Sequence, residues 1–479
     1  MIKKRFIKSL IKKNYFTKAM VLGKSKSLSD DYKVWSYYNL GMYKTASIFP
    51  KEQLRCRGLV AKIISLASCG EFEEAKSTLE FMLQHYNCHK YYIRLIDSLS
   101  PFMPHDALSL LETLTNKPTA LHTALLLKLG KVEKAKELIT TSILQKEYRT
   151  SPELLLYHSN ALISILPKEQ LTYINMYLAS FKLPKLYLKD RTQSCSTLNI
   201  SCRVHRKFSG PLVSVIMTTY NIGQRVDIAI ESILNQTYQN IELIVVDDKS
   251  SDNTVEIVER WVQKDRRVKL IKLSKNVGTY VAKNIALLQI AKGEFVTCHD
   301  SDDWSHPLKI QRQVEPLQKN RRLVASISSW VRLDDEGKFY ARPVHPLMRQ
   351  NPSSLLFRRK SVLKKVGIWD SVRTGADSEY IERIKLVVGR KNVLRIKEPL
   401  AFGAHREDSL MTASSTGFCD LGISSQRLEY WEAWRSWHIN ELRARKKPYL
   451  SSESFYERKF EAPKTIIVPK ADILNVSIK

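Results

Sequence analysis

Between Pro211 and Pro307 the sequence alternates between stretches typical of buried β-strands and stretches typical of helices. Aliphatic and β-branched residues dominate the expected strands, which are 211–221, 241–248, 268–273 and 294–300. The expected helices lie between them at 228–234, 253–263 and 281–291. Alternation with a repeat of about 25 to 30 residues is the pattern of a parallel, doubly wound sheet. We therefore expect an α/β domain here.

Polar side chains end three of the four expected strands. Ligands of such sheets bind beyond the carboxyl ends of the strands, so we expect these side chains to form one site. Clustered carboxylates repel each other unless donors or a cation compensate them. Mg²⁺ or Mn²⁺, held by one or two carboxylates and by substrate phosphates, would do so and would stabilise a departing diphosphate. The candidates are Thr218, Tyr220, Asp247, Asp248, Asp300, Asp302 and Asp303.

Two nucleotide-binding motifs are missing from this region. The sequence has no GxxxxGK[ST] loop, and no GxGxxG follows the first expected strand. Neither P-loop chemistry nor a nicotinamide enzyme is therefore supported.

The first 200 residues have a different pattern, which predicts helices throughout. A turn followed by a small residue recurs with a period of about 30 residues, which is typical of stacked helical hairpins. This resembles a tetratricopeptide-type array, although the spacing is irregular and short. Such arrays usually bind a protein partner, but a helical domain can also simply support its neighbour. The aligned alanines are Ala19, Ala46, Ala75, Ala107 and Ala135.

These patterns divide the chain into three parts. Residues 1–200 are expected to be a helical-hairpin repeat domain, and the polar stretch 191–210 reads as a linker. Residues 201–412 are expected to be the α/β domain, and 413–479 a C-terminal helical extension. The seven cysteines are scattered, and no pair has CxxC spacing. This predicts reduced thiols in a cytosolic protein, not a disulfide framework.

The formal net charge of +29 predicts attraction to an anionic ligand or surface. No pattern of an RNA- or DNA-binding module accompanies it, so nucleic acid is not an expected partner. Residues 2–11 fit a Lys-rich amphipathic helix, which could lie on anionic lipid or begin the helical domain. No apolar run is long enough to span a bilayer, and the start lacks a signal-peptide pattern. We expect a cytoplasmic protein that can lie on the inner face of the plasma membrane.

Five motifs follow each other in order from Pro211 to Pro307. They are VSVIMTTYN, SILNQTY, IELIVVDDKSSDNT, NVGTYVAKNIAL and GEFVTCHDSDDWSHP. The series resembles family 2 glycosyltransferases, and the similarity continues more loosely to about Thr412. The resemblance implies a GT-A fold and inverting transfer from a nucleoside-diphosphate sugar, with a UDP-sugar favoured. It implies a glycan or lipid-linked acceptor and, by analogy, a bacterial surface polysaccharide such as capsule or lipopolysaccharide.

The resemblance implies roles for residues on the nucleotide side. Thr218 and Tyr220 would line the nucleotide pocket, with Tyr220 beside the base. Asp248 would accept a hydrogen bond from the base, and Asp247 lies next to it, although both could be plain turn residues. Lys283 stands where the family commonly has Arg and would face the nucleotide or diphosphate. This substitution keeps the charge and loses the bidentate geometry.

The resemblance also implies a D-x-D motif. Asp300 would face the ribose or the sugar, and Asp302 would bind the metal ion, Mn²⁺ or Mg²⁺. Asp303 is the second candidate for a metal ligand. His405, in AHREDS, resembles a family histidine that reaches the metal or the diphosphate.

Inverting transfer needs a base that takes the proton of the acceptor hydroxyl. In the family this base comes from a Gly-Glu-Asp-like motif after the sheet, where this sequence has GADSEYIERI. Asp377 is therefore the candidate base and Glu379 the second candidate. Ala376 replaces the usual first acid of the motif.

Each of these residues also has a plainer interpretation. Asp302 and Asp377 could cap helices, Lys283 could be solvated, and His405 could be a packing residue. Trp304 could pack beneath the metal loop or touch the acceptor. The alternative for the whole chain is a helical-repeat scaffold with an inactive transferase-like domain.

Overall fold

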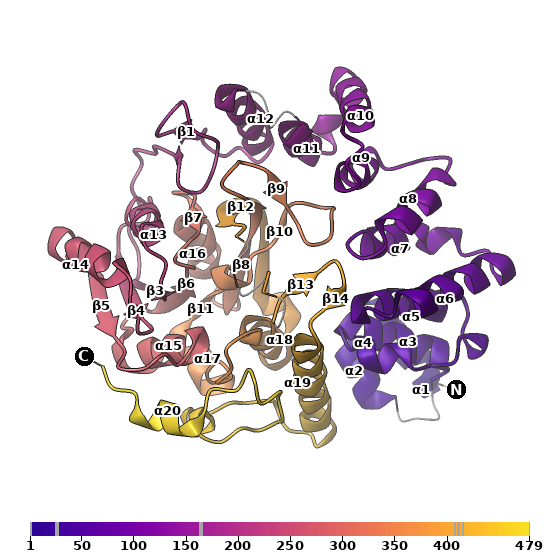
Figure 1. Ribbon diagram of the computed structural model, residues 1–479. Coiled ribbons are helices and arrows are strands. Elements are labelled where there is room, and N and C mark those ends of the chain that lie inside the picture. Colours follow the sequence, from indigo (N-terminus) through magenta and orange to yellow (C-terminus); the bar gives the residue numbers. More distant parts are fainter. Residues whose placement is uncertain are drawn as a thin grey trace.

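The computed structural model describes residues 2–23, 28–161, 166–406, 409, 412–413 and 416–478. The N-terminal helices form an arc along one side of a domain built on a large sheet (Figure 1). The helices of the arc are α1 (Ile2–Lys12), α2 (Phe16–Leu22), α3 (Asp30–Leu40), α4 (Tyr43–Ser47), α5 (Cys56–Cys69), α6 (Phe72–His85), α7 (Tyr92–Leu99), α8 (Pro104–Glu112), α9 (Thr119–Lys128), α10 (Val132–Leu144), α11 (Glu153–Ala161) and α12 (Pro167–Ala179).

The arc consists of packed helix pairs, as the repeat predicted. Helices α1 and α2, α3 and α4, α5 and α6, α7 and α8, and α9 and α10 contact each other. Every aligned alanine is the fourth residue of the second helix in its pair and is fully buried. The small side chain lets the two helices approach closely. The turns before α4, α6 and α10 contain Gly41, Gly70 and Gly130, whose positive φ angles favour glycine.

Helix α1 is the first helix of this array. Ile7 and Ile11 are buried in the same core as the helices that follow, whereas Phe6 is 56% exposed. The apolar stripe of α1 is thus used largely for packing inside the protein. In the described ranges, no helix is both long and apolar enough to cross a membrane.

The sheet of the second domain has the strand order β5-β4-β3-β6-β11-β8-β12-β7, and β9 and β10 pair with β8. Its first four strands are parallel, whereas β11 is antiparallel to both of its neighbours. The strands are β3 (Val213–Thr219), β4 (Ile241–Asp247), β5 (Val268–Lys272), β6 (Phe295–Cys298), β7 (Trp304–Ser305), β8 (Ala325–Leu333), β9 (Phe339–Tyr340), β10 (Arg349–Gln350), β11 (Leu356–Arg358) and β12 (Val393–Ala404). All four predicted strands are present in the predicted parallel arrangement.

Helices cover both faces of this sheet. One apolar core joins it to α13, α14 and α16, and another joins it to α15, α17 and α18. Alternate residues of β3 point into the two cores, Val215 into the first and Ile216 into the second. The helix predicted at 281–291 is α15 followed by a π-helical turn at Ala286–Ile290. The helices are α13 (Arg225–Leu234), α14 (Thr254–Lys264), α15 (Thr279–Ile285), α16 (Lys309–Lys319), α17 (Arg359–Lys365) and α18 (Ala376–Val388).

The first helix of the C-terminal segment lies between the array and the sheet domain, and the residues after it run along the sheet domain away from the array (Figure 1). That helix, α19 (Ser425–Arg443), contacts α2 and α4 on one side and α18 on the other. Glu432 accepts hydrogen bonds from the backbone N–H and the hydroxyl of Thr45, and Ile439 belongs to the core of the array. On its other side, Trp434 belongs to the core of the sheet domain. The remaining strands and α-helix are β1 (Tyr187–Leu188) and β2 (Ile200–Ser201), which pair with each other, β13 (Phe418–Cys419), β14 (Gly422–Ile423) and α20 (Lys470–Asn475).

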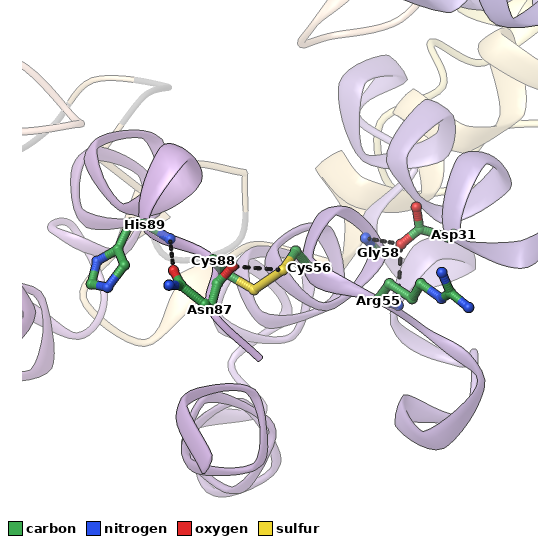
Figure 2. The surroundings of a disulfide bond; sticks show 7 residues. All are labelled: Asp31, Arg55, Cys56, Gly58, Asn87, Cys88 and His89. Carbon is green, nitrogen blue, oxygen red and sulfur yellow. Dashed lines mark hydrogen bonds between the residues drawn. A yellow bond between two sulfur atoms is a disulfide. The ribbon is translucent and has the colours of Figure 1, made fainter. Parts of the chain in front are cut away.

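The prediction that all cysteines are reduced is wrong for one pair. Cys56, at the start of α5, forms a disulfide with Cys88, which lies 32 residues further along the chain (Figure 2). That separation is close to the repeat length, so stacking of successive repeats brings the two side chains together. The sequence analysis considered only close cysteine spacings and therefore missed this pair. Asn87 beside it accepts a hydrogen bond from the backbone N–H of His89 (Figure 2).

Candidate active site

Asp248 directly follows β4 and holds the loop between β5 and α15. Its two carboxylate oxygens each accept a hydrogen bond of 2.7 Å, from the backbone N–H groups of Val277 and Gly278. Gly278 has a φ angle of 78°, a conformation that side chains other than glycine rarely adopt. Burial raises the pKa of Asp248 to about 6, although the two N–H groups act in the opposite direction. Asp248 therefore fixes the loop that leads into α15.

The other predicted residues at the ends of β3 and β4 lie nearby. The hydroxyl of Thr218 is 2.7 Å from that of Thr279, the first residue of α15. Asp247 accepts a hydrogen bond from the backbone N–H of Ser250 and is buried. Tyr220 is 52% exposed, so its ring is open to a ligand.

The three carboxylates after β6 have three different partners. Asp300 accepts a hydrogen bond from the hydroxyl of Ser353, and Asp302 pairs with Arg406 at 3.1 Å between Oδ2 and Nε. Asp303 accepts a hydrogen bond of 3.1 Å from the backbone N–H of Ala404. Its second oxygen, Oδ2, is buried and has no hydrogen-bond partner in the part of the chain that the structure describes.

These carboxylates share one electrostatic field. Burial raises the pKa of Asp303 well above its usual range, and the neighbouring Asp302 and Asp300 add to the effect. Burial also raises the pKa of Asp302, while Arg406 opposes the rise. A site that penalises its own negative charges in this way favours the arrival of a cation.

Lys309, in the first turn of α16, is a residue that the sequence analysis missed. Its side chain is almost fully buried, and Nζ lies 3.2 Å from the hydroxyl of Ser305. Burial lowers its pKa to about 8, whereas the carboxylates of Asp303 and Asp300 act to raise it. The available signal was helical phase, because Lys309 lies four residues before Gln313 on the buried side of α16.

Asp377, the second residue of α18, faces two residues of α15. Its Oδ2 lies 3.4 Å from Nζ of Lys283 and accepts a hydrogen bond of 3.2 Å from the hydroxyl of Tyr280. Lys283 is only 1% exposed, so the interpretation as a solvated residue is wrong. Its ammonium also lies 5.0 Å from the centre of the Tyr280 ring. The structure thus brings Lys283 and the candidate base together.

The pKa values of this pair follow from burial and from opposite charge. Burial raises the pKa of Asp377, Lys283 lowers it, and Asp300 raises it again, with a net rise. Burial acts to lower the pKa of Lys283, but Asp377 and the other acidic groups around it, Asp300 among them, together outweigh that effect and the pKa is raised. The influence of Asp300 on both groups connects this pair to the carboxylates after β6.

Glu379 is not accessible to a substrate, contrary to its prediction as a substrate-site residue. Its carboxylate is fully buried and bonded to Arg383 at 2.8 Å from each oxygen. His438 of α19 contributes a further contact of 2.9 Å. Burial acts to raise the pKa of Glu379, but its partners lower it to about 2. Glu379 faces the opposite side of α18 from Asp377, and its role is to join α18 to α19.

His405 precedes Arg406, the residue that pairs with Asp302. Its ring stacks on Tyr340, with the centres 3.7 Å apart and the planes within 6°. Burial lowers the pKa of His405 to about 4, and Arg332 acts in the same direction, so the ring is neutral at neutral pH. Its Nδ1 is buried and lacks a hydrogen-bond partner among the residues described.

Two plainer interpretations can now be decided. Asp302 does not cap a helix, because α16 begins at Lys309 and Asp302 pairs with Arg406 instead. Trp304 is buried, and its ring meets those of Phe402 and His306 edge to face, so it is a packing residue.

The carboxylates after β6 fit a hard divalent cation. Oxygen is the ligand that Mg²⁺ and Mn²⁺ prefer, and the unpaired buried Oδ2 of Asp303 is a site for one. No three side chains of metal-binding type converge on a point in the described residues. An ion shared with substrate phosphates does not need three, because one or two carboxylates suffice. The residues best placed to hold it are Asp302 and Asp303.

The strand order and the acidic edge of the sheet define an α/β domain of the GT-A class. Residues 214–375 match the profile of glycosyl transferase family 2. This match agrees with the family that the motif series predicted, and an all-helical region precedes it, as the alanine repeat predicted.

Several glycosyltransferases are similar to part of the chain. An uncharacterised glycosyltransferase of Haemophilus influenzae is 41% identical over 127 residues, which is 26% of this chain and 50% of that protein. Glycosyltransferase GlyG of Streptococcus pneumoniae is 38% identical over 130 residues, 27% of this chain and 42% of that protein. The Escherichia coli protein WfaP, a UDP-Glc:α-D-GlcNAc-diphosphoundecaprenol β-1,3-glucosyltransferase, is 39% identical over 110 residues, 23% of this chain and 43% of that protein.

Among solved structures, residues 1–349 of Staphylococcus aureus TarS, in complex with UDP-GlcNAc, are similar with a TM-score of 0.34 and 20% identity. That match covers 41% of this chain and 59% of the TarS chain. The chain spans half or less of the length of the three relatives above.

Proposed function

We propose that this chain is a metal-dependent inverting glycosyltransferase. It moves a sugar from a nucleoside-diphosphate sugar to a hydroxyl group of a glycan or lipid-linked acceptor. The observation that carries the proposal is the electrostatic grouping of Asp300, Asp302 and Asp303 with Asp377 and its partner Lys283. The three carboxylates after β6 can hold the donor diphosphate through a divalent cation, and Asp377 can take a proton.

The nucleotide lies at the ends of β3 and β4 in this proposal. The exposed ring of Tyr220 stacks beside the base, and Thr218 and Asp247 line the pocket. Both oxygens of Asp248 already bind backbone N–H groups, so its first role is to shape the loop against which the base rests. A UDP-sugar is the favoured donor, which the activity named for WfaP supports.

Asp302, with Asp303 beside it, would hold a divalent cation, Mn²⁺ or Mg²⁺. When bound, such an ion supplies Lewis-acid stabilisation of the leaving diphosphate. Arg406 neutralises Asp302 in the meantime, at 3.1 Å. Asp300 would face the ribose or the sugar. The neutral His405, which precedes Arg406 in the chain, would face the diphosphate.

Asp377 is the base in this mechanism. Both of its hydrogen-bonding neighbours contact Oδ2, so Oδ1 remains to take the proton of the attacking hydroxyl. The nearby ammonium of Lys283 lowers the pKa of Asp377 and so favours the ionised carboxylate, against the effects of burial and Asp300. The raised pKa then favours proton uptake as the acceptor oxygen attacks the anomeric carbon.

The acceptor belongs, in this proposal, to a bacterial surface polysaccharide such as capsule or lipopolysaccharide. The lipid-linked acceptor named for WfaP supports this assignment. The net charge of +29 favours the anionic cytoplasmic face of the plasma membrane, where lipid-linked acceptors are found. The helical array is a candidate surface for a protein partner.

The test is release of nucleoside diphosphate from a panel of sugar nucleotides, with and without Mn²⁺ or Mg²⁺. We expect release with at least one donor and its loss on chelation. Asp302→Asn should abolish the metal-dependent rate, and Asp377→Asn should abolish transfer but leave donor binding. Glu137→Gln, an exposed carboxylate of α10, is the matched control. Absence of both turnover and donor binding across the panel would instead favour the scaffold interpretation.

A further inference from the structure

A cavity of about 450 Å³ lies between the helical array and the sheet domain. The array lines it with Phe102, Lys128 of α9 and Tyr157 of α11, and the other side includes Tyr340 of β9 and Arg342. This volume is within the range of small-ligand sites in proteins, about 300 to 1,000 Å³. Neither part of the molecule forms the cavity alone.

The lining combines aromatic rings with positive charge. Rings come from both sides, and the cations are Lys128, Lys338 and Arg342. The one carboxylate of the lining, Asp420, is largely exposed and already pairs with Lys128 at 2.8 Å. The cavity therefore carries net positive charge, and aromatic faces with nearby charged groups are suited to a polar ring that has an anionic substituent.

Arg342 is the feature that points to a ligand. Its guanidinium lies 3.9 Å from the centre of the Phe418 ring, and it makes no hydrogen bond or ion pair within the described ranges. The side chain is half-buried, and this burial acts to lower its pKa. A guanidinium that lines a cavity without a protein partner offers a fork of donors that matches a carboxylate or a phosphate.

A series of side-chain contacts connects the wall of the cavity to the proposed reaction centre. Tyr340 lines the cavity and stacks on His405 at 3.7 Å. The next residue, Arg406, holds Asp302 of the D-x-D motif at 3.1 Å. The Tyr340 wall of the cavity is thus connected to the carboxylates of the proposed donor site through His405 and Arg406.

We propose that this cavity is the acceptor subsite and that it binds an anionic saccharide, a sugar carrying a carboxylate or a phosphate. Arg342, which rests on Phe418, binds the anionic group, Tyr340 packs against the sugar, and the helical array supplies one wall. The assignment of the saccharide as acceptor rests on the proposed transferase function. It gives the array a direct part in substrate choice.

The experiment measures binding to the full chain by calorimetry, without any sugar nucleotide. The probes are glucuronic acid and glucose 6-phosphate, each compared with neutral glucose. We expect both acids, or one of them, to bind at least about tenfold more tightly than glucose, because a bond to a charged group contributes that much. Arg342→Gln should reduce the affinity of the acid to that of glucose, and Lys338→Gln should weaken it less. Lys364→Gln, an exposed lysine of α17, is the matched control and should change nothing.

Three results would overturn the proposal: no binding of either acid, equal binding of glucose, or unchanged binding by Arg342→Gln. Melting temperatures identify a variant that has lost its fold, and in that case Arg342→Lys and Lys338→Gln decide. The order of the two acids separates a carboxylate from a phosphate ligand. Release of nucleoside diphosphate by the wild type is measured separately. A wild type that binds the acids and never turns over a donor contradicts the transferase function, whereas turnover without binding contradicts the subsite alone.

Discussion

The pair of Lys283 and Asp377 allows a quantitative prediction. Replacing Lys283 with methionine removes the cation that lies 3.4 Å from the carboxylate of the proposed base. The side chains of both residues are largely buried, with exposures of 2% and 17%, so water screens them little. Tyr280 remains as a hydrogen-bond donor, and the backbone at the start of α18 is untouched.

The size of the effect follows from Coulomb's law. Two unit charges 3.4 Å apart interact with about 5 kcal/mol at an effective dielectric constant of about 20. Relaxation and water entry reduce this energy, and we expect at least about a tenfold increase in the proton affinity of Asp377, which corresponds to one pH unit.

The assay is the pH dependence of kcat/KM for sugar transfer. The base works only when unprotonated, so activity falls as the pH drops through the pKa of Asp377. Removing Lys283 raises that pKa further, and the acidic limb of the profile must therefore move to higher pH by at least about one unit. Activity of the Lys283→Met variant should recover in part as the pH is raised.

Lys283→Arg is the matched control, because it keeps the charge that the family commonly has here. Its acidic limb should stay near that of the wild type. If Lys283→Met lowers the rate by the same factor at every pH, its acidic limb is unmoved, and either Asp377 is not the base or Lys283 does not set its pKa.

Three further predictions concern stability. Glu379→Gln breaks a buried ion pair and should cost about 3 to 5 kcal/mol in urea unfolding, with donor affinity of the folded fraction unchanged. Because the pKa of Glu379 is lowered to about 2, the wild type should lose this contribution as the pH falls from about 4.5 towards 2, and an equal loss in the Gln variant would contradict this. Ala75→Leu overpacks the contact between α5 and α6 and should cost about 1 to 3 kcal/mol, whereas the exposed Ala471→Leu should cost little. Alkylation without reduction should leave Cys56 and Cys88 unlabelled, and reduction should lower the unfolding free energy by about 3 kcal/mol; labelling of both before reduction would refute the bond.

Much of the parallel half of the sheet was predictable, because its signals are local. Runs such as Ile241–Asp247 are apolar on both faces, which a strand covered by helices on both sides requires. The acidic residues after Cys298 were predicted to belong to a site because ligands of such sheets bind beyond the carboxyl ends of the strands. The alanine repeat identified the paired helices, since a small residue at each close contact recurs with the unit.

The rest depends on contacts between residues that are distant in the chain. Strand β7 has only two residues and pairs with Ala401 and Phe402 of β12, so no local pattern reveals it. The partner of Asp302 is Arg406, and the burial of Glu379 depends on a histidine of α19. Glu379 was predicted to line the site because it lies two residues after Asp377 in the same motif. Residues two apart on a helix face different sides, so the two side chains point to different surroundings.

The position of α19 bears on how the protein can be cut. In a fragment that begins at residue 201, Ile439 would lose the core in which it is buried, and Glu432 would lose its bonds to Thr45. The fragment would expose an apolar strip along α19, the helix whose other side holds Glu379, so we expect it to aggregate or to need the array added back as a separate chain. The composition changes near residue 200, but the two parts on either side of this position are packed together through α19. We therefore do not expect them to separate as independent domains.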